Sequence, residues 1–133
     1  IRTADALGCA GLLLSADSAE PWSRQAVRST TGSVLRLPVA LAPDLPDAVA
    51  DLRRRGVRAV ASSGAAPLPA RDPDAGLGTR PLLLAVGNEQ HGVTDALVAA
   101  CDALVRIPMA PHTRADSLNV TVAAGILLYE ATR

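Results

Sequence analysis

The feature that most constrains the fold of this chain is a repeated alternation between short apolar runs and segments with helical spacing. The apolar runs cover Ala10–Leu14, Val57–Ala61, Pro81–Val86 and Ala103–Ile107. Runs of this length bounded by Gly, Pro or polar residues are typical of strands buried on both faces. Such strands separated by helices indicate an α/β fold with a mainly parallel sheet flanked by helices. We therefore predict a single α/β domain over residues 1–133.

The segments between these runs carry helix signals and one further strand signal. Helices are predicted over Arg2–Leu7, Pro21–Ser29, Asp47–Arg55, Thr94–Ala100 and Ser117–Thr132, and a strand over Val34–Val39. Gly8 and Gly56 end two of the helices, and Ser117 is the expected N-cap of the last one. That last helix is apolar on most faces, a pattern that favours burial on all sides. Residues 62–80 are rich in Pro, Gly, Ala and Asp, which predicts a loop.

The composition of the chain indicates which residues form the core, which redox environment the protein occupies and what kind of nucleic-acid site it could have. Aromatic residues make up only 2% of the chain and Phe is absent, so Leu, Val, Ile and Ala must form the core. The formal net charge is zero, so any nucleic-acid site has to be a local basic patch. Cys9 and Cys101 stand in apolar contexts without a CxxC pattern, which favours buried free thiols and a reducing cytoplasm. No apolar run approaches the length of a membrane span, and none is expected.

Three segments place polar residues where an α/β fold builds its sites. At residues 82–93 a strand runs into Gly87, and a glycine there lets a ligand approach the backbone at the strand's carboxyl end. At residues 107–130 the pair Ser117 and Asn119 stands at a helix start, whose free N–H groups can orient a ribose or a carboxylate. Residues 1–8 contribute Arg2. From the residues alone, an ordinary turn, a plain N-cap and a solvated arginine stay open as alternatives.

In the same order and with similar separations, these segments resemble the three motifs of the SpoU (TrmH-like) family of RNA ribose methyltransferases, within the SPOUT superfamily. IRTADALG is similar to the first motif, AVGNEQHGV to the second and IPMAPHTRADSLNVTVAAGILLYE to the third. The stretch RQAVRSTTGSVLRLPV at residues 24–39 resembles ribosomal-RNA members. The resemblance implies S-adenosylmethionine-dependent methylation of a ribose 2'-hydroxyl, with ribosomal RNA favoured over tRNA.

The resemblance also implies an architecture and a set of site residues. The expected fold ends in a deep trefoil knot, a rare exception to the rule against threaded chains, and the expected assembly is a cytoplasmic homodimer. The implied catalytic residues are Arg2, Glu89, Ser117 and Asn119, and the implied cofactor-binding residues are Gly87, Ile107, Met109 and Leu118. Because a guanidinium stays protonated, we expect Arg2 to bind phosphate or stabilise the developing alkoxide rather than act as a base. The family's first strand, the Asn of its first motif and any substrate-recognition domain are expected to precede Ile1.

Other functions remain open at this point. The motifs mark the reaction and the cofactor rather than the RNA, so a tRNA ribose methyltransferase of the same family is the first alternative. The second is a catalytically silent knotted scaffold that associates with RNA as a dimer, although the retained catalytic residues argue against it. A dinucleotide-binding enzyme is disfavoured because no GxGxxG follows a strand. No metal is predicted, since His91 and His112 stand in different loops without a carboxylate cluster.

Overall fold

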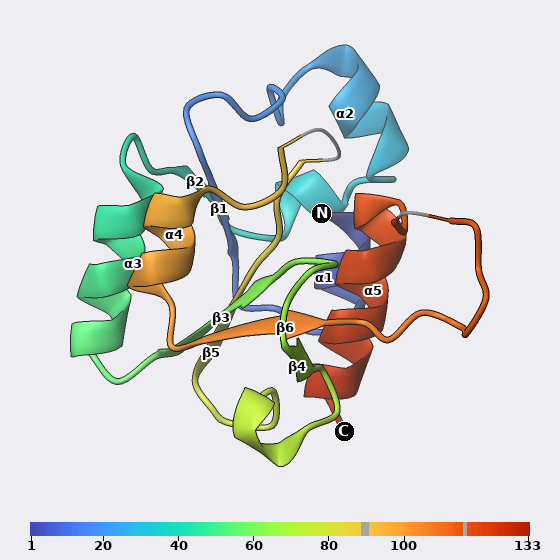
Figure 1. Cartoon of the computed structure of the whole chain (residues 1–133). Coiled ribbons are helices and arrows are strands. Elements are labelled where there is room, and N and C mark those ends of the chain that lie inside the picture. Colours follow the sequence, from blue (N-terminus) through green and yellow to red (C-terminus); the bar gives the residue numbers. More distant parts are fainter. Residues whose placement is uncertain (89–90, 116) are drawn as a thin grey trace. The chain divides into compact units, whose positions relative to one another are not determined.

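A computed structural model of the chain describes residues 1–88, 91–115 and 117–133. By the density of their internal contacts these residues divide into two compact units, Ile1–Leu45 and Pro46–Arg133, and each is described by itself. Figure 1 labels the helices and strands of both units.

The unit Ile1–Leu45 is built around a pair of short parallel strands. Its elements in order are α1 (Arg2–Ala6), β1 (Leu12–Leu14), α2 (Arg24–Ser29), the 3-10 helix η1 (Ser33–Leu35) and β2 (Val39–Leu41). In the parallel pair Leu12 lies opposite Val39. An ion pair of 2.6 Å between Arg36 and Asp5 joins α1 to the chain that follows η1. The hydrogen bond from Ser33 and the Arg36 guanidinium hold the pKa of the Asp5 carboxyl below its usual range.

The strand predicted over Val34–Val39 is wrong for most of its length. The segment begins as η1, and only Val39 lies in a strand, β2. Gly32 at φ 86° turns the chain sharply, and Ser33 then donates its backbone N–H to the Thr30 carbonyl. The buried residues of this segment are Val34 and Leu37, which are 1% and 6% exposed. A spacing of three residues places two side chains on one side of a 3-10 turn, and it is the wrong spacing for one face of a strand.

The unit Pro46–Arg133 contains a four-stranded parallel sheet. Its elements are α3, which begins one residue earlier (Leu45–Arg54), β3 (Arg58–Ser62), β4 (Leu68–Pro69), the 3-10 helix η2 (Pro73–Ala75), β5 (Leu82–Ala85), α4 (Asp95–Ala100), β6 (Ala103–Arg106) and α5 (Val120–Ala131). The strand order is β4-β6-β3-β5, and every pairing in it is parallel. The α/β class with parallel strands is confirmed. The predicted loop over residues 62–80 contains β4 and η2.

Helices cover both faces of the central strand β3. Val60 is fully buried in a cluster with Val105 of β6 and with Leu127 and Ala131 of α5. Its neighbours along the strand point to the opposite face, where Ala61 is also fully buried. Figure 1 shows α3 and α4 on the side of the sheet away from α5. Among the described residues no helix has the length and apolar character that a bilayer crossing requires.

Candidate functional site

Two of the residues predicted to bind a cofactor, Gly87 and Ile107, lie in loops at one edge of the parallel sheet. Strands β5, β3 and β6 are neighbours in the sheet, with Ala61 opposite Ala85 and Ser62 opposite Val105. Because the strands are parallel, their carboxyl ends meet at the same edge. Gly87 follows β5 and Ile107 follows β6, so both stand at this edge, separated by the end of β3. This is the edge at which open α/β sheets bind ligands.

Gly87 is required by the chain itself. A Cβ atom at this position would stand 1.9 Å from the carbonyl carbon of Gly92 and 2.3 Å from the nitrogen of Val93. The loop folds back through a bridge between Asn88 and Gly92, whose N–H donates to the Asn88 carbonyl at 3.0 Å. The backbone N–H of His91 donates to the Asn88 side chain at 2.7 Å. The sequence predicted that a ligand approaches Gly87 closely, whereas here the returning loop occupies the space beside its Cα.

The apolar side chains of the predicted site and of Val86 differ in how far they are covered. Ile107 is half-buried and packs against the core cluster, and Leu118 is half-buried as well. Met109 is 38% exposed, and Val86 at the end of β5 is 39% exposed. The predicted strand Pro81–Val86 includes Val86, whereas β5 ends at Ala85 and leaves Val86 exposed; Val86 is not among the residues predicted to bind a cofactor. Its position in the sequence, directly before Gly87, is the feature that could have identified it. Exposed apolar side chains at this edge are suited to contact a flat aromatic ring.

Asn119, not Ser117, caps the last helix. The Asn119 side-chain oxygen accepts hydrogen bonds from Thr121 N at 3.0 Å and from Val122 N at 3.4 Å. The helix therefore begins at Val120, and the prediction of a Ser117 cap is wrong. Asn is as good a cap as Ser, and the residue that reaches the second and third helical N–H groups decides the start. The Asn119 amide nitrogen has no partner among the described residues and can donate to a ligand. Ser117 is exposed in the preceding loop.

The remaining predicted residues are distributed over both units. Arg2 is the first residue of α1, in the unit Ile1–Leu45, and its side chain is exposed. Glu89 lies outside the described residues. The structure therefore brings Gly87 and Ile107 to one sheet edge. It places Ser117, Leu118 and Asn119 consecutively at the start of α5, within the same unit.

Two surface hollows formed by described residues lie elsewhere. One, of about 400 Å³, lies beside η2 and includes Arg71 and Glu130 in its lining. There Arg71 donates twice to one oxygen of Glu130, and the hydrogen bond from Arg71 lowers the pKa of that carboxyl. Because Arg71 and Glu130 neutralise each other, neither side chain is available to bind a charged ligand in this hollow. The second hollow is lined by residues of α2. Among the described residues no group of three or more His, Cys, Asp or Glu is placed to hold a metal ion.

Comparison with known proteins gives a consistent result. Residues 1–129 match the SpoU rRNA Methylase family. A 23S rRNA (uridine(2479)-2'-O)-methyltransferase of Streptomyces viridochromogenes is 39% identical over 138 residues, which cover all of this chain and 46% of that protein.

Solved structures agree over nearly the whole chain. The AdoMet-bound rRNA methyltransferase of Sinorhizobium meliloti superposes with a TM-score of 0.87 at 42% identity, over 98% of this chain and 48% of that one. The TrmH/SpoU tRNA-modifying enzyme of A. aeolicus gives 0.82 at 33% identity, over 99% of this chain and 64% of that one. The chain spans about half the length of the curated relatives that it matches.

Proposed function

The chain belongs to the SpoU rRNA Methylase family, and from that premise we propose that the protein is an S-adenosylmethionine-dependent ribose 2'-O-methyltransferase acting on ribosomal RNA. The observation that carries the proposal is the match over residues 1–129, together with 39% identity to a 23S rRNA 2'-O-methyltransferase. A solved relative at 42% identity holds AdoMet, which supports the same cofactor for this chain.

The residues at the carboxyl edge of the sheet fit an adenosine. Adenine needs apolar walls and a few fixed backbone partners. Ile107, Leu118, Met109 and Val86 supply apolar surface, and Gly87 supplies a backbone fixed by the returning loop. We assign these five residues to cofactor binding. The cofactor supplies a methyl group on a positively charged sulfur, so the remaining task of the protein is to position the ribose hydroxyl and help remove its proton.

Positioning of the nucleotide falls to polar residues from all three motifs. The Asn119 amide can donate to a ribose or carboxylate oxygen while its oxygen caps α5, so one side chain can couple the helix start to the ligand. We assign Ser117 and Glu89 to holding the nucleotide and the loops around it. Arg2 is exposed and always charged, which suits it to bind a phosphate or to stabilise the alkoxide as it forms.

A homodimer is part of the proposal. The face of α5 opposite its buried residues exposes Val122, Ile126 and Tyr129, at 52%, 37% and 57%. Their spacing of four and three residues aligns them in one stripe along the helix. An apolar stripe on an otherwise well-packed helix marks an association surface. A second copy of this chain is the occupant that the family resemblance implies.

We also propose the deep trefoil knot that the resemblance implies. Support comes from the loop that follows β3. Arg106 at the end of β6 donates to the carbonyl oxygens of Ala66, at 2.6 Å, and Pro67. These bonds hold that loop against the strand from which the chain runs on to α5, the segment that would be threaded.

A tRNA substrate is the second candidate, because the TrmH/SpoU tRNA-modifying enzyme of A. aeolicus matches 99% of this chain. The same residues would perform the same reaction on either RNA. Methylation assays with purified 23S rRNA and with bulk tRNA separate the two, since only the true substrate gains a methyl group at a ribose 2'-hydroxyl.

The cofactor assignment is tested by calorimetric titration with S-adenosylmethionine and S-adenosylhomocysteine. We expect saturable binding of both ligands. In methylation assays with RNA we expect Asn119→Ala to lower turnover. Because Asn119 also caps α5, Ser23→Ala is the matched control: it removes the cap of α2, whose Oγ accepts from Ala26 N at 3.2 Å. Each cap loss costs about 1 kcal/mol of stability, so the loss of stability from the cap alone should be similar in both variants.

Asn119→Asp separates the two roles further. The aspartate keeps an oxygen for the helix cap and loses the amide donor. We expect Asn119→Asp to fold as stably as the natural protein and still to methylate RNA more slowly. Absence of any cofactor binding by the folded protein would overturn the proposed function. Unchanged binding and turnover in Asn119→Asp would remove only this residue from the site.

A further inference from the structure

The arginines of this chain fall into two groups. The basic residues other than histidine are all arginine, and most of them are engaged. The engaged side chains bind carboxylates or backbone carbonyls: Arg36, Arg53, Arg54, Arg55, Arg58, Arg71, Arg80, Arg106 and Arg133. Arg2, Arg24, Arg28 and Arg114 have no such partner among the described residues. In a chain of zero net charge these are the guanidiniums left to bind an external anion.

Two of the four stand together on α2. Arg24 and Arg28 are four residues apart, so their side chains share one face of the helix. Helix α2 contains no acidic residue, and its start is held by the Ser23 cap. Both arginines help to line an open hollow on the surface of α2, with Gln25 and Ser29 between and beside them. The two arginines supply two positive charges that no acidic residue of this helix neutralises.

An exposed indole directly precedes the helix that carries these charges. Trp22 directly precedes the Ser23 cap, is 54% exposed, and is the only tryptophan of the chain. Its backbone N–H donates to the Glu20 carboxylate at 3.0 Å, which fixes the turn that presents the ring. The preceding residue, Pro21, is buried. The exposed ring therefore offers an aromatic face on which another ring can stack.

We infer that Trp22, Arg24 and Arg28 form a binding surface for single-stranded RNA, separate from the residues that hold the reacting nucleotide. The ring stacks on a base and the two guanidiniums bind flanking phosphates, the combination that sequence-tolerant single-strand binding uses. The inference rests on the proposed function, because it assigns part of the substrate contact to a helix outside the three family motifs.

The test uses a twelve-nucleotide oligouridylate as the probe. Its binding is followed by the anisotropy of a dye on the oligonucleotide and, independently, by quenching of Trp22 fluorescence. We expect saturable quenching in the natural protein. Trp22→Ala should weaken binding by roughly 5- to 150-fold, the range for loss of one stacked base. Trp22→Phe should restore most of the affinity, since stacking needs only an aromatic face.

Salt dependence tests the arginines. A double variant Arg24→Gln, Arg28→Gln should bind more weakly, and the slope of log affinity against log salt should fall by about 1.4, or 0.7 for each lost phosphate contact. The matched control is Arg54→Gln, Arg55→Gln on α3, which removes the same charge from arginines that already pair with Asp51. That control should leave the slope close to the natural value. Circular dichroism of each variant confirms that it is folded.

The outcomes separate this inference from the proposed function. Equal slopes in the natural protein and the α2 double variant would overturn the inference, as would a natural protein that does not bind the probe. Binding of polyglutamate as strong as that of the oligouridylate would reassign the surface to an acidic protein and also overturn it. If cofactor binding and RNA methylation persist in any of these cases, only the α2 surface is wrong. If the natural protein neither binds cofactor nor methylates RNA, the proposed function fails.

Discussion

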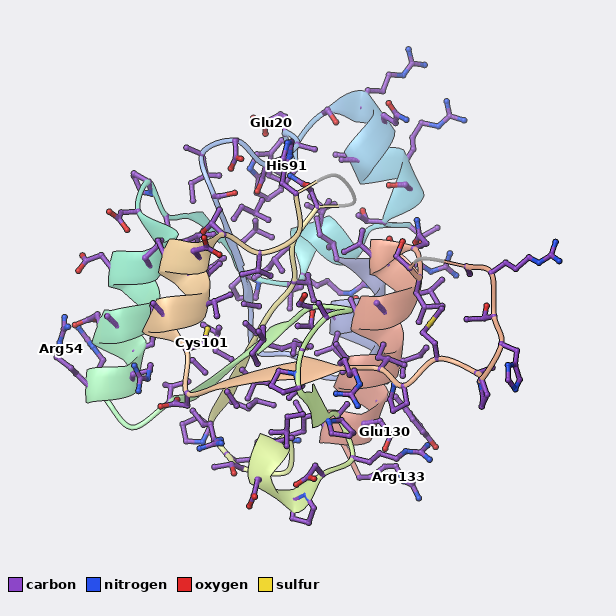
Figure 2. All side chains as sticks on the ribbon, viewed as in Figure 1. Glu20, Arg54, His91, Cys101, Glu130 and Arg133 are labelled. Carbon is purple, nitrogen blue, oxygen red and sulfur yellow. The ribbon has the colours of Figure 1, made fainter. Side chains whose placement is uncertain are left out.

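Helices α3 and α5 belong to the same unit and differ in what they present outward. Helix α3 buries Val49 and carries Asp51, Arg54 and Arg55 on its exposed surface, in two ion pairs of 3.2 and 2.8 Å. Helix α5 buries Leu127 and Ala131 on one side and exposes its apolar stripe of Val122, Ile126 and Tyr129 on the other. Figure 2 shows charged side chains such as Arg54 extending from α3. The outer face of α3 carries charges that water solvates, whereas the outer face of α5 is apolar, and the proposed dimer contact rests on that difference.

A charge placed in the apolar stripe is the most severe test of the proposed dimer contact. Ile126→Glu places a carboxylate in the proposed dimer contact, and by two-fold symmetry it does so twice. An unpaired buried charge costs about 3–5 kcal/mol, so two abolish the dimer at micromolar concentration. Light scattering should show a dimer for the natural protein and a monomer for Ile126→Glu.

The matched control for this variant is Leu35→Glu. Leu35 lies in η1 and is 75% exposed. The substitution there also replaces an exposed aliphatic side chain with a carboxylate. It should leave the dimer intact. A natural protein that is a clean monomer at micromolar concentration would contradict the proposal and leave the stripe without an occupant.

The buried faces of α3 and α5 should both contribute to the free energy of unfolding. Leu127 and Val49 are 0% and 2% exposed, so both anchor their helices in the core. Leu127→Ala should lower the free energy of unfolding by about 2–5 kcal/mol through lost burial and a cavity, and Val49→Ala by less because fewer atoms are removed. Urea unfolding measures both. Equal losses would mean that the sheet closes around the space left by Leu127.

The contrast between the helices also explains what the sequence could predict. The helical spacing of residues 47–55, with its charged outer positions, predicted α3 within two residues at its start. The apolar spacing of the last helix predicted burial on all sides, and this is wrong for the chain alone. Sequence pattern shows that a face is apolar, but it does not show whether the same chain covers that face.

The candidate site was also predicted only in part from the sequence. Motifs identified the family correctly, because several residue types recur in a fixed order. The cap of α5 was assigned to Ser117, since Ser and Asn are equally good caps and only the hydrogen bonds of Asn119 decide between them. The tight approach to Gly87 was expected from a ligand. Its source, the backbone of Gly92 and Val93, is a tertiary detail that the local sequence does not encode.

A smaller loss of stability is expected from removing the ion pair that joins Arg53 of α3 to Asp102. Asp102 accepts from Arg53 at 2.5 and 2.8 Å and, with its other oxygen, from Ala59 N at 2.8 Å. Asp102→Asn should cost about 1.5–3 kcal/mol, the range for hydrogen bonds to a charged group. Asp51→Asn is the control. Its carboxylate is 42% exposed and pairs only at the surface of α3, so its loss should cost no more than about 1 kcal/mol.

At acid pH the natural protein and Asp102→Asn should have similar free energies of unfolding. Burial raises the pKa of the Asp102 carboxyl, but the hydrogen bonds from Arg53 and Ala59 outweigh it and leave that pKa below its usual range. A carboxyl with a lowered folded pKa stabilises the protein above its unfolded pKa, and the contribution is lost as pH falls through the folded value. Urea unfolding of both proteins should therefore differ most near neutral pH and converge at acid pH. A difference that is constant with pH would show that the Asp102 contacts depend on shape rather than on charge.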